Sequence, residues 1–244
     1  MSDKSVAIGF IHEDKMDCWF VHSLLGLLLD DMQGPQSIAG RYLGLYSGPM
    51  LDAARNQCVR GFLSHPDQPE WLLMVDTDMT FTPADFYKLL TWADKDRYPV
   101  VAGLCFAGSA KGRIWPVMMV ARPSDDQESG GFTLAEVRGY PKDKMCRVDA
   151  TGAAFMLVHR RVFEEMLAMD PDSPAPWFRF AYMGKRQFGE DTPFCLRCRT
   201  LGIPVYVHTG VRIGHVKTKV LDEEAYEEWV AKHGHGDELE AVKM

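Results

Sequence analysis

The sequence predicts an α/β fold in which a mostly parallel central sheet is flanked by helices. Short apolar runs have the composition of strands that are covered on both faces, and they span residues 6–11, 71–75 and 205–207. Segments with helical periodicity or helix-start signals lie between such runs, at about residues 19–29, 82–93 and 192–202. Strands that alternate with helices indicate a parallel sheet, because each helix returns the chain to the same edge before the next strand begins.

The first half of the chain shows the clearest element boundaries. The run at 6–11 is the first expected strand, and the run at 71–75 is a central strand that stops abruptly at Asp76. A helix begins soon afterwards, with Thr82 as its N-cap and Pro83 at its first position.

The second half continues the alternation. Further strands are expected at residues 100–106, 117–120 and 153–158. The last of these leads into a helix at about 161–169, and another helix opens at Thr192-Pro193. The polar, glycine-rich residues 123–131 are expected to form an exposed loop.

Composition excludes several classes of protein. With 46% hydrophobic and 25% charged residues, the 244-residue chain is expected to be globular rather than disordered. No apolar run approaches the roughly 18 residues that cross a bilayer, so we expect no membrane span. The start Met1-Ser2-Asp3-Lys4 lacks the apolar core of a signal peptide, which predicts a cytoplasmic protein. The net charge of -7 argues against a broad surface for duplex nucleic acid, and the six scattered cysteines indicate reduced thiols.

Asp76-Thr77-Asp78 is the first candidate site. The two carboxylates follow a buried strand, at the edge where open α/β sheets bind their ligands. Carboxylates in this position suit a Mg²⁺ or Mn²⁺ ion that bridges a diphosphate. Acidic pairs also end strands as solvated loop residues, and the triplet alone does not decide between the two interpretations.

Two further motifs combine charge with a predicted helix. The segment 48–56 predicts a turn and a helix, on which Arg55 and Asn56 either are solvated or face a nucleotide, since a guanidinium matches phosphate oxygens. Glu190 and Asp191 come just before another helix, whose N-terminus favours ionised carboxylates. Asp191 there either accepts a proton from an acceptor hydroxyl or contributes to an N-cap.

His215 is the last candidate ligand. A lone histidine is more often structural, but an imidazole beside two carboxylates completes an N/O ligand set that suits Mn²⁺ better than Mg²⁺. Cys195 and Cys198 are rival partners for His215 and His208 in a zinc site. Both cysteines fall on a predicted helix with no second cysteine pair, so we do not expect zinc.

One aromatic cluster has two interpretations. Its members are Trp177, Phe178, Phe180 and Tyr182. They either stack on sugar rings or bases, or pack in the core beneath a loop, and the sequence does not choose between these roles.

In their order along the chain, these segments resemble family-two glycosyltransferases of the GT-A type. The Ala-Arg-Asn segment at 54–56, followed by an apolar strand ending in Asp-x-Asp, is similar to their nucleotide-sugar half. Residues 148–157 resemble the small-residue strand that lines their sugar and acceptor pocket, and residues 189–191 resemble their acidic catalytic motif. His215 matches the third metal ligand of several such enzymes. The resemblance covers residues 6–216, and the compact length is most similar to the small glycosyltransferases that bacteriophages encode, which would place the protein in the host cytoplasm.

The resemblance implies a GT-A (Rossmann-like) fold and metal-dependent transfer of a sugar from a nucleotide-sugar donor, with a UDP-sugar expected. It implies that Asp78 and His215 bind Mn²⁺ or Mg²⁺, with Asp76 sharing the metal or contacting the ribose. Asp191 is implied as the catalytic base of an inverting, hexosyltransferase-like reaction, with Glu190 close to the acceptor.

The resemblance also implies contacts with the donor. The residues implied beyond the metal ligands are Arg55, Asn56, Thr77, Gly152 and Ala153. Ile11, His12 and Glu13 stand where the family holds the base, but they do not match its usual residues. Uridine and other bases therefore stay open.

We expect a single domain, because no internal repeat or linker divides the chain. The resemblance implies a nucleotide-sugar-binding half at about residues 1–110 and an acceptor-binding, catalytic half at about 111–221. Asp222 is expected to cap an acidic C-terminal helix, so that residues 222–244 form this helix and a tail.

Three rival functions stay open at this point. A retaining transferase on the same fold would use Asp191 or Glu190 to position the acceptor. A sugar-nucleotidyltransferase usually carries a glycine-rich, basic loop near its N-terminus, which residues 9–14 are not. A non-catalytic nucleotide-sugar-binding protein would lack the metal or the base. The sequence identifies neither the acceptor, for which protein, glycan, lipid and modified DNA base are candidates, nor an oligomeric state.

Overall fold

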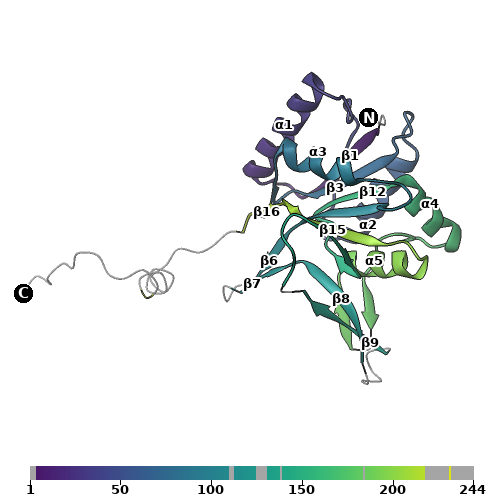
Figure 1. The fold of residues 1–244 in the computed structure, drawn as a ribbon. Coiled ribbons are helices and arrows are strands. Elements are labelled where there is room, and N and C mark those ends of the chain that lie inside the picture. The colour runs from purple at the N-terminus through teal and green to yellow at the C-terminus, as the bar shows by residue number, and fades with distance from the viewer. Residues whose placement is uncertain are drawn as a thin grey trace, which may run out of the picture.

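The computed structural model describes residues 4–109, 113–124, 131–137, 139–183, 185–217 and 231 of the chain. The acidic helix expected after Asp222 lies outside the described residues. One large sheet, with helices packed against it, dominates the fold, and smaller strands extend from one end of it (Figure 1).

The large sheet has seven strands and is mostly parallel, as the sequence predicted. In spatial order they are β10 (Met145–Val148), β15 (Val205–Arg212), β5 (Val100–Leu104), β12 (Phe155–His159), β3 (Trp71–Asp76), β1 (Val6–His12) and β2 (Tyr42–Tyr46). Strands β2, β1 and β3 pair in parallel, and so do β5 and β15. Strand β12 is antiparallel to both its neighbours, and β10 is antiparallel to β15.

Helices cover both faces of this sheet. The described helices are α1 (Cys18–Gln33), α2 (Leu51–Leu63), α3 (Pro83–Trp92), α4 (Arg160–Met169) and α5 (Asp191–Thr200). Successive side chains of a strand point to opposite faces, so Ile8 joins a core with Phe20 of α1, while Ala7 joins a second core with Phe62 of α2. Helix α3 shares the core of α1, and α4 and α5 share that of α2. No helix within the described ranges combines the length and apolar character that a bilayer crossing requires.

Local sequence signals explain where the helices begin. Thr82 caps α3 in a reciprocal capping box with Asp85, and Pro83 is its first residue, as predicted. Asp17 caps α1 by accepting from the amide of Trp19.

Helix α2 packs unusually close to β1. A side chain at Gly9 would overlap Sγ of Cys58, so only glycine permits this approach. The contact fixes the position of Arg55, one turn before Cys58 on α2.

Four smaller sheets complete the described fold. They pair β4 (Met79–Thr80) with β16 (Gly214–His215), β6 (Phe106–Gly108) with β7 (Ile114–Pro116), β13 (Ala181–Met183) with β14 (Arg186–Phe188), and β8 (Met118–Pro123) with both β9 (Phe132–Glu136) and β11 (Ala150–Thr151).

One expectation about strands was wrong, and one strand was missed. The chain at 148–157 is not one strand: β10, β11 and β12 occupy it in three pieces, with Gly152 to Ala154 between the last two. Strand β2 was not predicted, because an edge strand whose residues are alternately exposed and half-buried contains no apolar run.

Candidate active site

The carboxyl ends of β1, β2 and β3 meet at one edge of the sheet. Ile11 lies beside Asp76 in the register of β1 and β3, and His12 lies beside Tyr46 in that of β1 and β2. The hydroxyl of Thr77 donates to the carbonyl of Ile11 over 3.3 Å, which ties the turn after β3 to this edge. The predicted donor-site residues at the end of β1 and those at the end of β3 are therefore neighbours.

The rim of this edge is aromatic and exposed. The rings of His12 and Tyr46 lie 6.2 Å apart, edge to face, and Tyr46 is largely exposed. Glu13 is exposed beside His12, whose Nδ1 lies 2.8 Å from the Glu13 carbonyl. Tyr46 was missed in the sequence because it ends the unpredicted strand β2.

Asp78 and His215 come together although 137 positions separate them. Strand β16 pairs with β4, which places His215 opposite Met79, and the amide of Val216 donates to the Asp78 carbonyl. The Nε2 atom of His215 lies 2.9 Å from Oδ2 of Asp78, and the ammonium of Lys217 donates to the same oxygen over 2.9 Å.

The orientation of His215 fits a metal ligand. Its Nδ1 lies 2.7 Å from the carbonyl oxygen of Phe106, which only accepts, so Nδ1 carries the proton in the neutral ring. Nε2 then directs a lone pair toward the space that Oδ2 of Asp78 also faces, an arrangement typical of metal-binding histidines. Without a metal, the hydrogen bond to Asp78 raises the pKa of His215, despite the opposing effect of burial.

Asp76 lies apart from this pair. Its Oδ1 accepts from Nη2 of Arg55 over 2.8 Å. Among the described residues, no group of three His, Cys, Asp or Glu side chains converges as a metal site. Asp78 and His215 are thus the two predicted ligands that the structure brings together, and Mn²⁺ or Mg²⁺ commonly takes its other ligands from water and phosphate.

Arg55 is the centre of a buried charge cluster. Its Nε donates to Oε1 of Glu190 over 2.9 Å and lies 3.8 Å from Oδ1 of Asp191, while Nη2 binds Asp76. Burial alone would lower the pKa of Arg55, but the charges of Asp76, Asp191 and Glu190 outweigh it and raise that pKa. The guanidinium therefore stays charged and joins β3 to α5.

Arg55 and Asn56 occupy positions unlike those expected for direct nucleotide contacts. The Arg55 side chain is only 2% exposed, and it is buried against the carboxylates instead of facing solvent. Asn56 is buried, and its amide bonds the backbone of Asp52, Trp177 and Phe178. Geometry thus gives Arg55 an indirect role and Asn56 a structural one.

Asp191 has the properties of a proton acceptor. Burial and the charges of Glu190 and Asp76 raise its pKa to about 7, although Arg55 and a backbone hydrogen bond from Ala153 oppose the shift. The helix N-terminus favours the ionised form of Asp191, as the sequence suggested, but burial acts in the opposite direction and is the largest influence on this pKa. Oδ1 is buried without a hydrogen-bond partner, while 28% of the side-chain surface is exposed.

The capping interpretation of this motif receives little support. Helix α5 begins at Asp191, one residue earlier than expected, and Glu190 at the N-cap makes no side-chain capping bond. The Glu190 carboxylate faces Arg55 instead.

Gly152 and Ala153 border Asp191. A Cβ atom on Gly152 would lie 3.5 Å from Oδ2 of Asp191 and 3.4 Å from Cγ1 of Val117. Ala153 is fully buried. The absence of a side chain at Gly152 therefore leaves room between Asp191 and Val117.

Cys105 shows that the carboxylates share one neighbourhood. Burial and the negative charges of Asp76, Asp191 and Asp78 all raise the pKa of this buried thiol. Carboxylates predicted from two separate motifs therefore lie within electrostatic range of one thiol, directly after β5.

Two members of the aromatic cluster pack in the core, and the other two are exposed. Trp177 and Phe178 are buried, and Phe178 stacks on Phe194 of α5 with ring centroids 4.6 Å apart. Phe180 and Tyr182 are exposed near the hairpin that leads into Glu190. All six cysteines of the chain are free thiols.

Comparison with known proteins gives likeness in structure but not in sequence. No protein-family model and no curated protein sequence matches the chain. The structure of A197 from STIV matches with 15% identity and a TM-score of 0.53, over 88% of this chain and 86% of its own. GalNAc-T7, determined with UDP, GalNAc and Mn²⁺, matches with 12% identity and a TM-score of 0.54, over 87% of this chain but only 44% of its own. Identities this low establish shared architecture alone: the chain has a GT-A-like α/β fold.

Proposed function

We propose that this chain is a metal-dependent glycosyltransferase of the family-two type, which transfers a sugar from a nucleotide-sugar to an acceptor hydroxyl with inversion. A UDP-sugar is the expected donor. One observation carries the proposal: the Asp78–His215 pair and the partly exposed Asp191 both lie close enough to Cys105, directly after β5, for their carboxylates to act on the same thiol. GalNAc-T7, of similar fold, is a protein crystallised with UDP, GalNAc and Mn²⁺, which supports this donor and metal.

The donor half of the reaction belongs to the edge formed by β1, β2 and β3. Tyr46 and His12 offer ring surfaces to a base, and Thr77 and Asp76 lie between these rings and Asp78. Asp78 and His215 would hold the divalent cation. A bound Mn²⁺ or Mg²⁺ neutralises charge on the diphosphate.

Asp191 accepts the acceptor's proton in this proposal. The acceptor oxygen attacks the anomeric carbon, the bond from that carbon to the diphosphate oxygen breaks, and the hydroxyl proton passes to the Asp191 carboxylate. A base with a pKa near 7 matches this task at neutral pH. Arg55 holds Asp76 and Glu190 in place, and the charges of these two carboxylates raise the pKa of Asp191 while the charge of Arg55 opposes the rise.

The test is a panel of nucleotide-sugars incubated with the protein and Mn²⁺, with release of nucleoside diphosphate as the readout. We expect release from a UDP-sugar, its loss on chelation, and its loss in Asp78→Ala. Full release in excess chelator would contradict the metal assignment. If only sugar 1-phosphate and nucleoside triphosphate react, with release of pyrophosphate, the chain is a nucleotidyltransferase. Binding of nucleotide-sugar without release, with or without an acceptor panel, would indicate a binding protein.

A further inference from the structure

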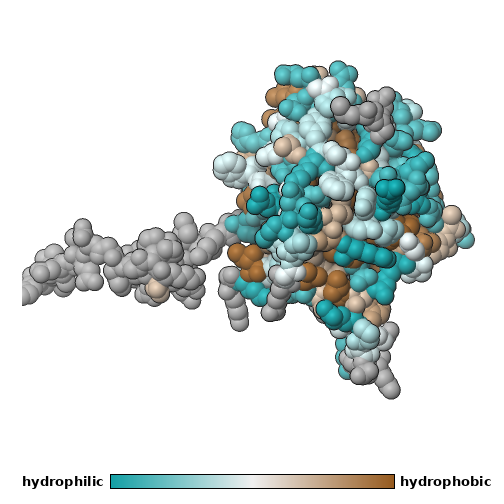
Figure 2. Space-filling view, in the orientation of Figure 1, coloured by the Kyte–Doolittle hydropathy of each residue, from teal (hydrophilic) through white to brown (hydrophobic). Residues whose placement is uncertain are grey.

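A cavity lies near Asp191, and its lining includes none of the site residues that the sequence predicted. It is a cavity of about 580 Å³ between β7, β8 and β9, lined chiefly by Arg113, Trp115, Val117, Met119, Leu134 and Glu136. Figure 1 shows these strands extending from the end of the large sheet. In Figure 2, apolar and hydrophilic side chains lie side by side over this part of the molecule.

Val117 connects the cavity to the proposed base. It lines the cavity and its Cγ1 atom lies against Gly152, whose other neighbour is Oδ2 of Asp191. Two backbone contacts fix Val117: its amide donates to Cys105, and its carbonyl accepts from the Thr151 hydroxyl over 2.6 Å. Val117 and Gly152 are therefore the residues that lie between the cavity and the Asp191 carboxylate.

The lining has the chemistry that recognises a sugar ring. The half-buried indole of Trp115 offers a flat apolar surface, and the guanidinium of Arg113 lies 5.1 Å from its centroid. Arg113 also pairs with Glu136, so hydrogen-bond donors over the indole ring stand together with a carboxylate acceptor. A pyranose needs this combination, because its C–H face is apolar and each of its hydroxyls both donates and accepts.

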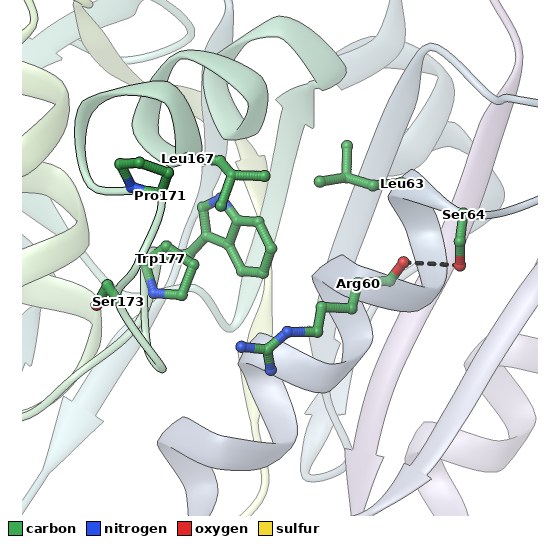
Figure 3. A pocket seen from close by; sticks show the side chains of 8 residues that line it. Arg60, Leu63, Ser64, Leu167, Pro171, Ser173 and Trp177 are labelled. Atoms are coloured by element: carbon green, nitrogen blue, oxygen red, sulfur yellow. Dashed lines mark hydrogen bonds between the residues drawn. The ribbon is translucent and has the colours of Figure 1, made fainter.

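A second cavity in the fold provides the contrast. It has about 390 Å³ and pairs Arg60 with Trp177, whose indole lies 5.7 Å from the guanidinium (Figure 3). Here the groups are already satisfied by backbone: the Trp177 indole donates to Phe163, and Arg60 donates to Pro174. Trp177 is 2% exposed, and none of the described residues that line this cavity is a carboxylate. The Arg–Trp pair near Asp191 differs in having an accessible indole and an acidic partner.

We propose that the cavity around Trp115 is the acceptor site and that the acceptor is a carbohydrate. This assignment rests on the proposed glycosyltransferase function for its catalytic meaning, and it names the substrate class of that same site. The acceptor ring stacks on Trp115, its hydroxyls bond Arg113 and Glu136, and one hydroxyl passes Val117 to reach Asp191.

The experiment measures saccharide binding in the absence of any donor. Methyl pyranosides and disaccharides are screened by ligand-observed NMR against the wild type, Trp115→Ala and Arg60→Ala, with N-acetyl-tyrosinamide and a short oligonucleotide as rival probes. We expect at least one saccharide to bind the wild type and Arg60→Ala equally, and to lose about tenfold or more in Trp115→Ala. Trp115→Phe and Glu136→Gln keep the test valid if Trp115→Ala fails to fold: Phe should retain part of the binding, and Gln should weaken it.

Donor turnover is measured in parallel on the same variants. Unchanged release of nucleoside diphosphate, with weakened saccharide binding, supports an acceptor site separate from the donor site. Saccharide binding that is equal in all variants, or binding of the tyrosine or oligonucleotide probe alone, overturns the proposal. If neither the wild type nor any variant turns over a donor, the proposed glycosyltransferase function fails. The saccharide site at Trp115 is still decided by the NMR binding measurement.

Discussion

The Nε atom of Arg55 donates to Oε1 of Glu190 over 2.9 Å and so connects α2 to the start of α5 across 135 positions. The same guanidinium binds Asp76, so one cation holds together a carboxylate at the end of β3 and another at the start of α5. A cluster of three carboxylates around one buried cation is stable only while that cation remains.

Replacing Arg55 with Met should therefore destabilise the fold. Breaking a buried ion pair by removing one partner costs about 3–5 kcal/mol, because the remaining charges stay buried. Urea denaturation at pH 8 should show this loss, with Arg60→Met on the exposed side of the same helix as the control. If Arg55→Met were as stable as Arg60→Met, the carboxylates of Asp76, Glu190 and Asp191 would not depend on Arg55 for their burial.

Asp191 should set the acidic limit of activity. Its raised pKa means that the carboxylate becomes ionised as pH rises through about 7, so kcat/KM for transfer should rise over that range. At Asp191 the folded state binds more protons than the unfolded state between about pH 4 and 7, because an unfolded Asp has a pKa of about 3.9. The contribution of Asp191 to stability should therefore be lost as pH rises through this window.

Asp191→Asn separates the two effects. Transfer should drop by about 10²–10⁴-fold, the usual contribution of a general base. Donor affinity should hold, and stability above pH 7 should not decrease, because a costly buried charge is gone. Wild-type transfer by this variant would remove Asp191 as the base.

Glu190→Gln should move the acidic limit without abolishing transfer. The negative charge of Glu190 raises the pKa of Asp191, so a neutral amide at that position should shift the limit to lower pH. The pH profile of kcat/KM measures this shift. A profile that keeps its midpoint, or a shift to higher pH, would contradict the electrostatic coupling.

Lys217 should compete with the metal for Asp78. Its ammonium donates to the oxygen that faces His215, and a cation at about 4 Å in water costs an incoming cation about 1 kcal/mol. Lys217→Met should therefore tighten Mn²⁺ binding about fivefold in calorimetry, whereas His215→Ala should weaken it. Weaker Mn²⁺ binding in Lys217→Met would show that Lys217 supports the site instead.

Gly152→Ala tests the path to Asp191. The added methyl would meet Asp191 and Val117 at ordinary contact distances, so folding should survive. It would narrow the approach to the carboxylate, so transfer should fall while donor release without acceptor is kept. Equal losses of both would point to a general disturbance of the site.

The sequence predicted the parts of the site that depend on a single element. Asp76 could be located because an apolar run ends there, and the carboxyl edge of a parallel sheet is where such ends gather. The burial of Arg55 could not be predicted, because it depends on Gly9 and on carboxylates far along the chain. The pairing of Asp78 with His215 depends on β16 joining β4, and only the family resemblance anticipated it.

The cavity around Trp115 was missed for a different reason. Residues 113–119 and 134–136 belong to short strands outside the large sheet, and their side chains converge only through pairings of β6, β8 and β9. The sequence signal that could have indicated the cavity is Trp115, which stands between Arg113 and the strand predicted at residues 117–120.

The position of β15 has a consequence for synthesis of the chain on the ribosome. It is the last strand of the large sheet to be made, yet it lies inside the sheet, between β5 and β10. Until β15 is inserted, β5 is an open edge of the sheet. Its five residues, which are all buried in the folded chain, can then pair with another nascent chain. Chains that stop before residue 205 should therefore aggregate rather than persist as a folded N-terminal part.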